Sequence, residues 1–571
     1  MSKAALIWFL LGLGLLLGAC DEAPKQSAAK GDAAAALKAH GKLFTKEVLT
    51  PVPGIHVAVG YGLANVIMIE GEDGVIIVDT LESRSRAAEA LAALRQVSAK
   101  PVKAIILTHN HADHIYGAQV FAGGQDIPVY AHQSTSDHID RIINVLVNSI
   151  YRRSMAMFGQ LLPQGLVLND GIGPDLKTVT EELALLRPSK TFEKRLDVTI
   201  AGVKLQLHHA PGETDDQLFV WLPRRKILLP GDNIYQTFPN LYTIRGTAHR
   251  DVMQWVRSLD KMRDLGAEVL VPSHTRPLVG GKQVAETLTA YRDGMQYVHD
   301  QTVRGMNLGL GPEQLVEFVY LPPHLAEHPW LAEHYGTVRW SVRAVFNGYL
   351  GWFSGDAVDL DPLSPGERAR QLQAAFADSK SIPAQARAAL SAGRYQWAAE
   401  LSRYWRLNDP DAGEADEVMA AALTALGERS GNPNARNWYL TQAHELRGEL
   451  EIGKPDPSVL PADMLDGLPI APFMAGMSTR LKAEDALDTD LLARFEFSDE
   501  DRVFSMHIRR GVAALRETAT PNPDIHIKTT ARTWKRIVTK QRNPALAFAS
   551  DEIDAEGGVA GIVKFLSLFE R

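Results

Sequence analysis

The sequence predicts an α/β fold, an αββα sandwich, followed by an all-α helical region and a smaller α+β segment. Three observations predict it. Short apolar runs bounded by turn residues recur between residues 55 and 271, amphipathic helical patterns lie between them, and helical periodicity with interspersed tryptophans and tyrosines begins near residue 283. Two β-rich halves with covering helices are typical of two packed sheets with a helical layer on each outer face.

The first β-rich half begins near residue 55. Strand-like runs cover residues 56–59, 65–69 and 74–79, and Glu72-Asp73-Gly74 between the last two is a hairpin turn signal. Residues 83–94 form an alanine-rich amphipathic helix. The β-branched and leucine-rich run 102–107 follows Pro101 and is typical of a buried strand.

The second half and the remainder follow in the same way. We expect strands at 197–210, 218–222, 226–229 and 269–271, with a helix at 251–265. Residues 283 to about 450 are helical, and 383–392 with 395–407 form a helical hairpin. After Pro455-Asp456-Pro457 the chain mixes helix with strands at 494–497 and 525–528, so this proline pair marks a boundary.

The N-terminus has the features of a secretory signal. Lys3 precedes the apolar stretch 4–17, and Leu17-Gly18-Ala19-Cys20 resembles the lipobox of bacterial lipoproteins. That resemblance implies a signal peptide over 1–20, a lipidated Cys20 and an anchor on the periplasmic side of a bacterial membrane, with Asp21 favouring the inner membrane. We expect residues 21–40 to be a flexible linker. The alternative is an ordinary anchor helix with a chance cysteine.

Composition excludes several classes of protein. Cys20 is the only cysteine of 571 residues, so no intrachain disulfide and no thiolate zinc site can form. The net charge of −8 is spread over the chain without a basic run, so we expect no nucleic-acid partner.

The most informative segment is Thr108-His109-Asn110-His111-Ala112-Asp113-His114, which directly follows the predicted strand 102–107. Imidazole and carboxylate ligands suit zinc and related divalent ions. His109 and His111 can reach one ion, while Asp113 and His114 turn toward a second. The alternative is a polar loop with solvated histidines, which fits four potential ligands at this spacing poorly.

Further ligand candidates follow later strands. Glu213 comes after the run ending at residue 210, Asp232 after 226–229, and His274 after 269–271. A carboxylate after a strand is usually a turn or cap residue, so each is weak alone. Their shared placement at strand ends, together with the opening motif, predicts a site for two metal ions with a water between them.

This set resembles the metallo-β-lactamase superfamily. Carried over by position, the resemblance implies that His109, His111 and Glu213 hold the first zinc and Asp113, His114 and His274 the second, with Asp232 bridging the two. Asp79, at the end of its strand, resembles the family's supporting aspartate, which orients a ligand imidazole. Manganese or iron can occupy similar sites.

Glu213 narrows the resemblance to the alkylsulfatase (SDS hydrolase-like) branch, because most of the superfamily has histidine there. Residues 241–246, 291–294, 299–302 and 349–353 also resemble that branch. The resemblance implies a catalytic domain at 41–282, a helical dimerisation domain at 283–455 and a sterol-carrier-like domain at 456–571. It further implies a homodimer, and an apolar wall near the site that the C-terminal domain supplies.

The implied reaction is hydrolysis of an alkyl sulfate ester to alcohol and inorganic sulfate by a metal-bridging hydroxide. Arg245 matches the sulfate oxygens, Asn240 donates beside it, and Asp113 and Asp232 position the metals. The chain departs from the branch at Asp232, usually glutamate, and at Trp340 and Gln236, usually histidines; Arg339 is a substitute sulfate donor. Alternatives are a dizinc hydrolase of a lactone, thioester, β-lactam or phosphoester, and a non-catalytic membrane-tethered amphiphile carrier.

Overall fold

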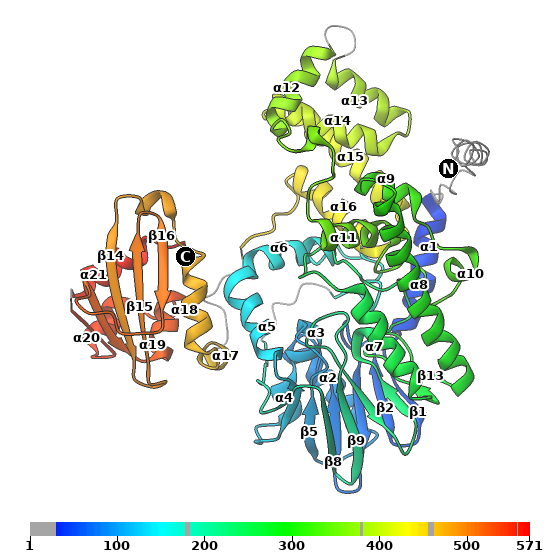
Figure 1. The fold of residues 1–571 in the computed structure, drawn as a ribbon, viewed down its shortest axis with the longest axis horizontal. Helices are drawn as coiled ribbons and strands as arrows, with labels where there is room; N and C mark the ends of the chain where they lie inside the picture. Colours follow the sequence, from blue (N-terminus) through cyan, green and yellow to red (C-terminus); the bar gives the residue numbers. More distant parts are fainter. Residues whose placement is uncertain (1–29, 177–182, 377–380, 455–461, 557, 571) are drawn as a thin grey trace, which may run out of the picture.

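The computed structural model describes residues 30–176, 183–376, 381–454, 462–556 and 558–570 (Figure 1). The expected signal peptide, Cys20 and the first part of the expected linker lie outside these residues. Within the described ranges, no helix combines the length and the apolar character that crossing a membrane requires.

The first sheet contains seven strands whose spatial order follows the chain. The strands are β1 (Glu47–Val52), β2 (Ile55–Val59), β3 (Val66–Glu70), β4 (Val75–Val78), β5 (Val102–Ile106), β6 (Val129–His132) and β7 (Lys190–Phe192). Strands β1 to β4 pair antiparallel, and β4 to β7 pair parallel. The carboxyl ends of the parallel strands therefore meet at one edge of the sheet, where the histidine motif follows β5.

The second sheet contains six strands in the order β13-β12-β11-β10-β9-β8. They are β8 (Arg195–Ile200), β9 (Val203–His209), β10 (Leu218–Leu222), β11 (Ile227–Leu229), β12 (Val269–Leu270) and β13 (Leu278–Val279). The expected single strand at 197–210 is instead the hairpin β8–β9. Its turn contains Ala201 and Gly202, both with positive φ, and the apolar alternation changes phase there, from Val198 and Ile200 to Val203 and Leu205.

The two sheets pack face to face, which confirms the predicted αββα sandwich. Their shared core contains Ile67, Ile76 and Ile106 from the first sheet and Leu207 and Val220 from the second. On the outer face of the first sheet lie α2 (Arg84–Arg95) and α4 (Ala118–Ala122). On the outer face of the second lie α7 (Val252–Asp264) and the long α8 (Gly281–Asn307) (Figure 1).

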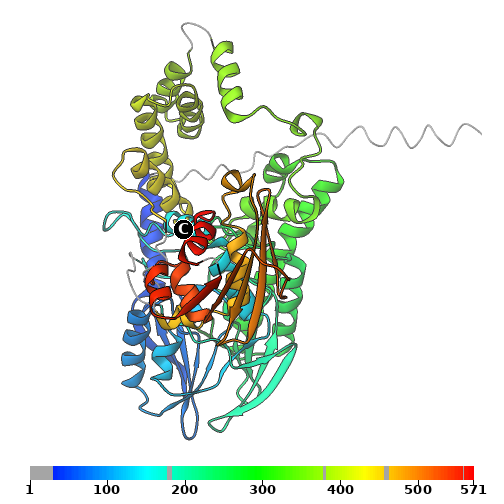
Figure 2. The ribbon, with the colours of Figure 1, turned by 90° about the vertical axis from the view of Figure 1, so that its left-hand side faces the viewer.

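The helical region is continuous with the sandwich. The boundary expected after residue 282 falls in the first turn of α8, and α8 shares its core with α7 and α11. The remaining helices are α9 (Pro312–Phe318), α10 (Pro323–Ala326), α11 (Val338–Leu350), α12 (Pro365–Ala375), α13 (Ile382–Ser391), α14 (Tyr395–Asn408), α15 (Gly413–Arg429) and α16 (Pro433–Leu446). Helices α13 and α14 form the predicted hairpin, and α12–α15 stand away from the sandwich (Figure 2).

The C-terminal segment is an α+β domain with its own core. Its sheet has the order β16-β15-β14-β17-β18. The strands are β14 (Asp490–Phe497), β15 (Arg502–Arg509), β16 (Val512–Arg516), β17 (Ile525–Thr529) and β18 (Ile553–Glu556); the helices are α17 (Ala462–Asp466), α18 (Ile470–Ser478), α19 (Ala531–Val538), α20 (Pro544–Ala549) and α21 (Gly558–Ser567). The domain lies beside the sandwich, with α18 packed against α5 (Thr135–Arg141) and the turn Ile142–Leu146 that follows it (Figure 1).

Part of the expected flexible linker is ordered. Residues Lys30–His40 form helix α1, which packs against α15, and Leu37 is fully buried. The backbone carbonyl of Leu37 accepts a hydrogen bond from Asn169 Nδ2 at 2.7 Å. The expectation of a flexible linker is therefore wrong from Lys30 onward. Its alanine-rich composition suggested flexibility, but alanine is also the strongest helix former, and a docking surface was available.

Candidate metal centre

The candidate ligands lie on loops at one edge of the sandwich. The motif after β5 leads into the short helix α3 (Ala112–Ile115), and Glu213 lies in the β9–β10 turn. Asp232 lies in the 3₁₀ turn Gly231–Asn233 after β11, and His274 follows β12. The fold thus brings to this edge every candidate ligand that the sequence predicted from strand ends.

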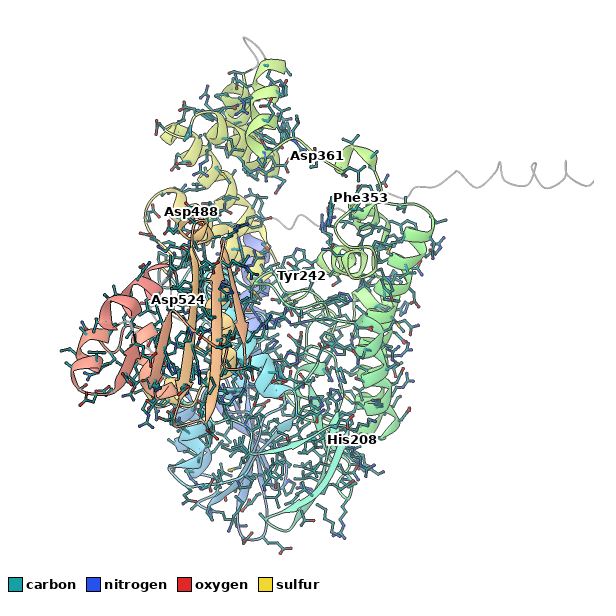
Figure 3. The ribbon with its side chains drawn as sticks, turned by 60° about the vertical axis from the view of Figure 1, so that its left-hand side comes forward. His208, Tyr242, Phe353, Asp361, Asp488 and Asp524 are labelled. Atoms are coloured by element: carbon teal, nitrogen blue, oxygen red, sulfur yellow. The ribbon has the colours of Figure 1, made fainter. Side chains whose placement is uncertain are left out.

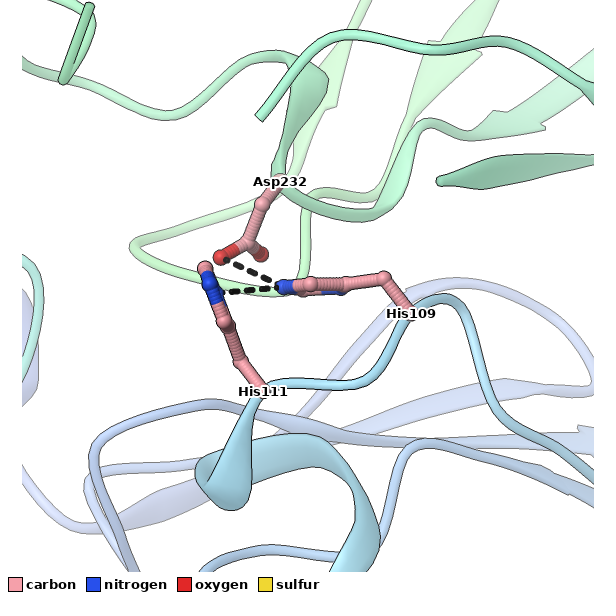
Figure 4. A group of neighbouring side chains, drawn as sticks. All are labelled: His109, His111 and Asp232. Atoms are coloured by element: carbon pink, nitrogen blue, oxygen red, sulfur yellow. Dashed lines mark hydrogen bonds and ion pairs between the residues drawn. The ribbon is translucent and has the colours of Figure 1, made fainter. Parts of the chain in front are cut away.

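Six of these side chains form two groups that could each hold one ion. The first contains His109, His111 and Asp232, and the second contains Asp113, His114 and His274. In the first group, His109 Nε2 lies 2.8 Å from His111 Nδ1 and 3.7 Å from Asp232 Oδ2 (Figure 4). In the second, Asp113 Oδ2 lies 3.4 Å from Nε2 of both His114 and His274.

Asp232 lies between the two groups. Its Oδ2 is 3.0 Å from His274 Nε2 and 3.3 Å from His114 Nε2, in addition to its contact with His109. This is the position that a bridging carboxylate would take. The second oxygen, Oδ1, is buried and has no hydrogen-bond partner among the described residues, and the same is true of His114 Nε2. Because burying unpaired polar atoms is costly, the donor set fits a pair of divalent ions that these atoms would coordinate.

The protonation of the first group favours metal binding. Burial, followed by the neighbouring His114, lowers the pKa of His109 to about 3. Burial and then His109 also hold the pKa of His111 well below its ordinary value. Both imidazoles are therefore neutral at physiological pH, the form in which histidine binds a metal.

The carboxylates concentrate negative charge where cations would lie. Burial opposes ionisation of Asp232, but His114 and His274 hold its pKa well below the ordinary range. Burial also disfavours the charged form of His114, yet the surrounding carboxylates, Asp232 first, raise its pKa well above the usual value. A dication bound at Nε2 would replace that proton and take over the same favourable interaction.

Asp79 supports the candidate metal centre by a hydrogen bond to His114, as the sequence predicted. Its carboxylate accepts hydrogen bonds from His114 Nδ1 at 2.8 Å, from the backbone and hydroxyl of Thr108 at 2.9 and 3.0 Å, and from Ser273 Oγ at 2.7 Å. The contact places the His114 proton on Nδ1 and leaves Nε2 facing the other ligands.

Glu213 is near the first group but is held by other partners. Its Oε1 lies 4.0 Å from His111 Nδ1 and 3.0 Å from Arg250 Nη1, and its Oε2 accepts a hydrogen bond of 3.0 Å from Tyr235. Sequence reasoning missed Tyr235 and Arg250, both buried, because no motif marks them and they are distant from Glu213 in the sequence.

The site opens into a cavity of about 280 Å³, here called the apolar cavity. Its walls include Ile139, Ile142, Ile150, Met155 and Phe158. One end is polar, with His111, Asp113, Glu213, Asp232 and Arg245. Glu82, which the sequence did not single out, also lines it. We expected the C-terminal domain to supply an apolar wall of the site, and for the described residues this expectation is wrong. The residues that line the apolar cavity belong to the sandwich and its insertions, apart from Tyr335 of the helical region.

A second cavity of about 400 Å³, the basic cavity, meets the apolar cavity at the site. Both are lined by His111, Arg245, Ile142 and Ile150. The basic cavity also contains Arg141, Arg153, Arg250, His138 and His249. Arginine side chains outnumber the carboxylates of Glu213 and Asp215 there, so this branch favours anions.

The predicted substrate residues divide into those near the site and those away from it. Arg245 Nη2 lies 3.2 Å from His111 Nε2, within reach of both cavities. Asn240 is buried, and its backbone N–H donates to Tyr235 at 3.0 Å, but it lines neither cavity. Arg339 pairs with Glu317 at 3.2 Å on the exposed surface of α11. Neither Asn240 nor Arg339 lines a cavity beside the metal groups, so the substrate contacts expected of them stay predictions.

Trp340 also lies away from the metal groups. It lines a third cavity of about 440 Å³, which shares His249 and Arg250 with the basic cavity. From the sequence we expected that tryptophan in place of histidine at position 340 removes one donor to the sulfate group. Trp340 does not line the apolar cavity.

The fold and the site define the class of protein. Residues 59–274 match the model of the metallo-β-lactamase superfamily. Residues 311–449 match the alkyl sulfatase dimerisation model, and residues 458–571 match the alkyl sulfatase C-terminal model. With the paired histidine and carboxylate groups at the strand ends, the chain is a metal-dependent hydrolase of this superfamily.

Individual relatives narrow the family. The chain is 38% identical over 521 residues to a linear primary-alkylsulfatase of Pseudomonas sp. (strain ATCC 19151), covering 88% of this chain and 98% of that protein. It is 28% identical over 543 residues to an (R)-specific secondary-alkylsulfatase of Pseudomonas sp., covering 91% and 80%. The solved structure of the stereoselective inverting sec-alkylsulfatase Pisa1 from Pseudomonas sp. superposes with a TM-score of 0.85 at 26% identity, covering 92% and 85%. The chain belongs to the alkylsulfatase family.

Proposed function

We propose that this protein hydrolyses alkyl sulfate esters to an alcohol and inorganic sulfate with two zinc ions. The observation that carries the proposal is Arg245, whose guanidinium lies 3.2 Å from His111 at the point where the apolar cavity meets the basic one. An alkyl chain fits apolar walls, and a planar guanidinium matches the oxygens of a sulfate group. The relatives' names support the same substrate class.

The residues that would hold the ions follow from the two groups. His109, His111 and Glu213 would bind the first, and Asp113, His114 and His274 the second, with Asp232 between them. Two zinc ions would supply a water nucleophile that ionises near neutral pH. The protein's own part is to orient the sulfate through Arg245, to keep water from the chain through the isoleucine walls, and to hold His114 through Asp79.

The test is release of inorganic sulfate from dodecyl sulfate by the purified, zinc-loaded protein. We expect turnover that a chelator removes, that zinc restores, and that His111→Ala abolishes. A parallel panel of a lactone, a thioester, a β-lactam and a phosphoester separates the substrate classes. Turnover of one of these, with a range of primary and secondary alkyl sulfates left intact, would reject the proposal. Binding of amphiphiles without any turnover would favour a carrier.

We also propose a homodimer formed through the chain around and after the end of α11. Tyr349, Leu350, Trp352, Val358 and Leu360 are 57–77% exposed there, and a run of exposed apolar side chains is typical of a surface that binds a partner. Phe353 and Asp361 lie on the same connection to α12 (Figure 3). A match of residues 311–449 to the dimerisation model supports a second copy as the occupant.

For location, we propose a lipid anchor at Cys20 on the periplasmic side of a bacterial membrane, with the inner membrane favoured by Asp21. The lipobox-like sequence supports this proposal. Wild-type protein should fractionate with membranes and Cys20→Ala with the soluble periplasmic fraction. Equal distribution of the two proteins would reject the anchor.

A further inference from the structure

One continuous helical segment separates the C-terminal domain from the cavities. It consists of α5 (Thr135–Arg141), the π-helical turn η2 (Ile142–Leu146) and α6 (Val147–Met157). Ile142 and Ile150 line both cavities, and Leu146 lines the basic one. π-Helical turns are rare and occur frequently at functional sites. This turn therefore forms part of the wall against which an alkyl chain would pack.

The opposite face of the same turn contacts the C-terminal domain. Asn144 is buried, and its backbone oxygen would lie 2.5 Å from a Cβ atom placed on Gly476 of α18. The Asn144 Cβ would lie 2.9 Å from the same atom. Ile143 packs against the C-terminal core. Only glycine at position 476 allows α18 to approach η2 this closely, because any side chain would displace the turn.

An arginine makes a second link between the same two parts. Arg187 Nε donates to the backbone carbonyl of Gly467 at 3.1 Å, and its Nη1 donates to Asp140 of α5 at 3.3 Å. Asp140 in turn lies one helical turn before Asn144, whose Nδ2 donates to the Asp140 carbonyl at 2.9 Å. The C-terminal domain thus holds the wall segment at two points without lining either cavity.

We propose that the C-terminal domain sets the depth of the apolar cavity through η2, which makes Gly476 a specificity-determining residue for alkyl chain length. The inference rests on the proposed function, because it assumes that the apolar cavity receives an alkyl chain. A side chain at 476 pushes Asn144, and with it Ile142, toward the cavity. Long alkyl chains then lose contacts with the end of the cavity that short alkyl chains do not reach.

The test compares Gly476→Ala with Gly561→Ala in the full-length, zinc-loaded protein. Gly561 is a matched control, because it lies in helix α21 of the same domain and its added Cβ would meet Ile525 only at 3.6–4.0 Å, an ordinary contact. The probes are linear alkyl sulfonates from hexyl to tetradecyl, which resist hydrolysis, and affinity is measured by calorimetry. Each buried methylene should add about fourfold in affinity for the wild type and for Gly561→Ala.

For Gly476→Ala we expect the fourfold increments to stop at a shorter chain, with hexyl sulfonate bound as in the wild type. Arg187→Gln, a second variant, leaves Gly476 in place but removes the link from Asp140 to Gly467. It should also reduce the gain in affinity per methylene. Wild-type chain-length profiles in both variants would overturn the inference. Because the readout is binding, it is separate from turnover: absence of sulfate release in the wild type would reject the proposed function, while an altered profile would still support the wall.

Discussion

Oδ2 of Asp79 lies 2.8 Å from Nδ1 of His114, and the same carboxylate also contacts Thr108 and Ser273. Asp79 adopts a left-handed conformation with φ of 59°, which costs about 1–2 kcal/mol for an L-residue. The strain is offset by contacts from two separate parts of the chain, the histidine motif and Ser273. Such a residue is fixed in place, so it can fix the ring of His114 and leave Nε2 free for an ion.

Replacing Asp79 by asparagine should therefore weaken metal binding more than it weakens the fold. We expect zinc affinity to fall by about 10–100-fold, the usual effect of losing a group that orients a ligand. Competition with a chromophoric chelator measures it. Ser273→Ala, which removes a neighbour of Asp79 and keeps the His114 contact, should have a smaller effect. Equal zinc affinity in Asp79→Asn and wild type would contradict the role.

Arg245 should affect anionic substrates selectively. Arg245→Ala should lower kcat/KM for an alkyl sulfate by about 10²–10³-fold, because it removes a preorganised donor near the reacting group. An uncharged ester, if turned over at all, should be unaffected. Arg339→Ala is the control, since that side chain pairs with Glu317 on the surface, and its kcat/KM should stay within about twofold of wild type. A larger loss in Arg339→Ala than in Arg245→Ala would reverse the assignment.

The buried pair of Arg250 and Glu213 should be strongly coupled. Arg250→Met leaves the Glu213 carboxylate buried without its cation, which costs about 3–5 kcal/mol of unfolding free energy in the metal-free protein. Adding Glu213→Gln should recover part of that loss. Denaturant unfolding of the two single variants and the double variant gives the coupling energy. Strictly additive effects would show that the 3.0 Å contact between Arg250 and Glu213 does not contribute to the unfolding free energy.

Glu82 gives a pH dependence with a definite sign. Burial, against the opposing charge of Arg86, raises the pKa of the Glu82 carboxyl from 4.5 to about 7. Below pH 4.5 the folded and unfolded chains both hold the proton, so the group makes no contribution to the pH dependence of the unfolding free energy. Between pH 4.5 and 7 only the unfolded chain releases it, so the folded wild type loses stability as pH rises.

Glu82→Gln removes this titration. The unfolding free energy of the variant relative to wild type should therefore rise between pH 4.5 and 7, by up to about 3 kcal/mol. Urea unfolding of metal-free protein across that range checks it. A difference that stays constant with pH would show that Glu82 titrates normally.

The exposed apolar connection after α11 predicts the oligomeric state. Trp352 is 71% exposed and Val358 77%. Trp352→Ala and Val358→Asp should each shift a dimer toward monomer in sedimentation velocity, because each removes apolar area from the proposed interface or places a charge in it. Val512→Asp, an exposed apolar position on the C-terminal sheet, should not. Dimers of unchanged stability in all three variants would place the interface elsewhere.

Sequence reasoning reached the candidate metal ligands because their signal is local. His109, His111, Asp113 and His114 are close in sequence, and Asp232 and His274 follow strands whose ends must meet at one edge. It did not reach Tyr235 or Arg250, since an ordinary tyrosine or arginine becomes a partner of Glu213 only through packing. For the same reason the sequence did not indicate that Asn240 and Arg339 lie outside both cavities.

The contacts between domains could not be predicted from the sequence either. Gly476 resembles any helical glycine until α18 is placed against Asn144, which is more than three hundred residues away. The buried face of α1 is likewise visible only once α15 is beside it. Local patterns indicated elements and ligands, whereas docking depends on surfaces that no single segment contains.

His111 and Arg245 stand where the apolar and basic cavities meet. Under the proposed function, a substrate cut at that junction would leave an alcohol in the apolar cavity and a sulfate beside Arg245 in the basic one. Because the two products would then occupy different cavities, we expect them to leave in random order, and each to inhibit the enzyme independently of the other.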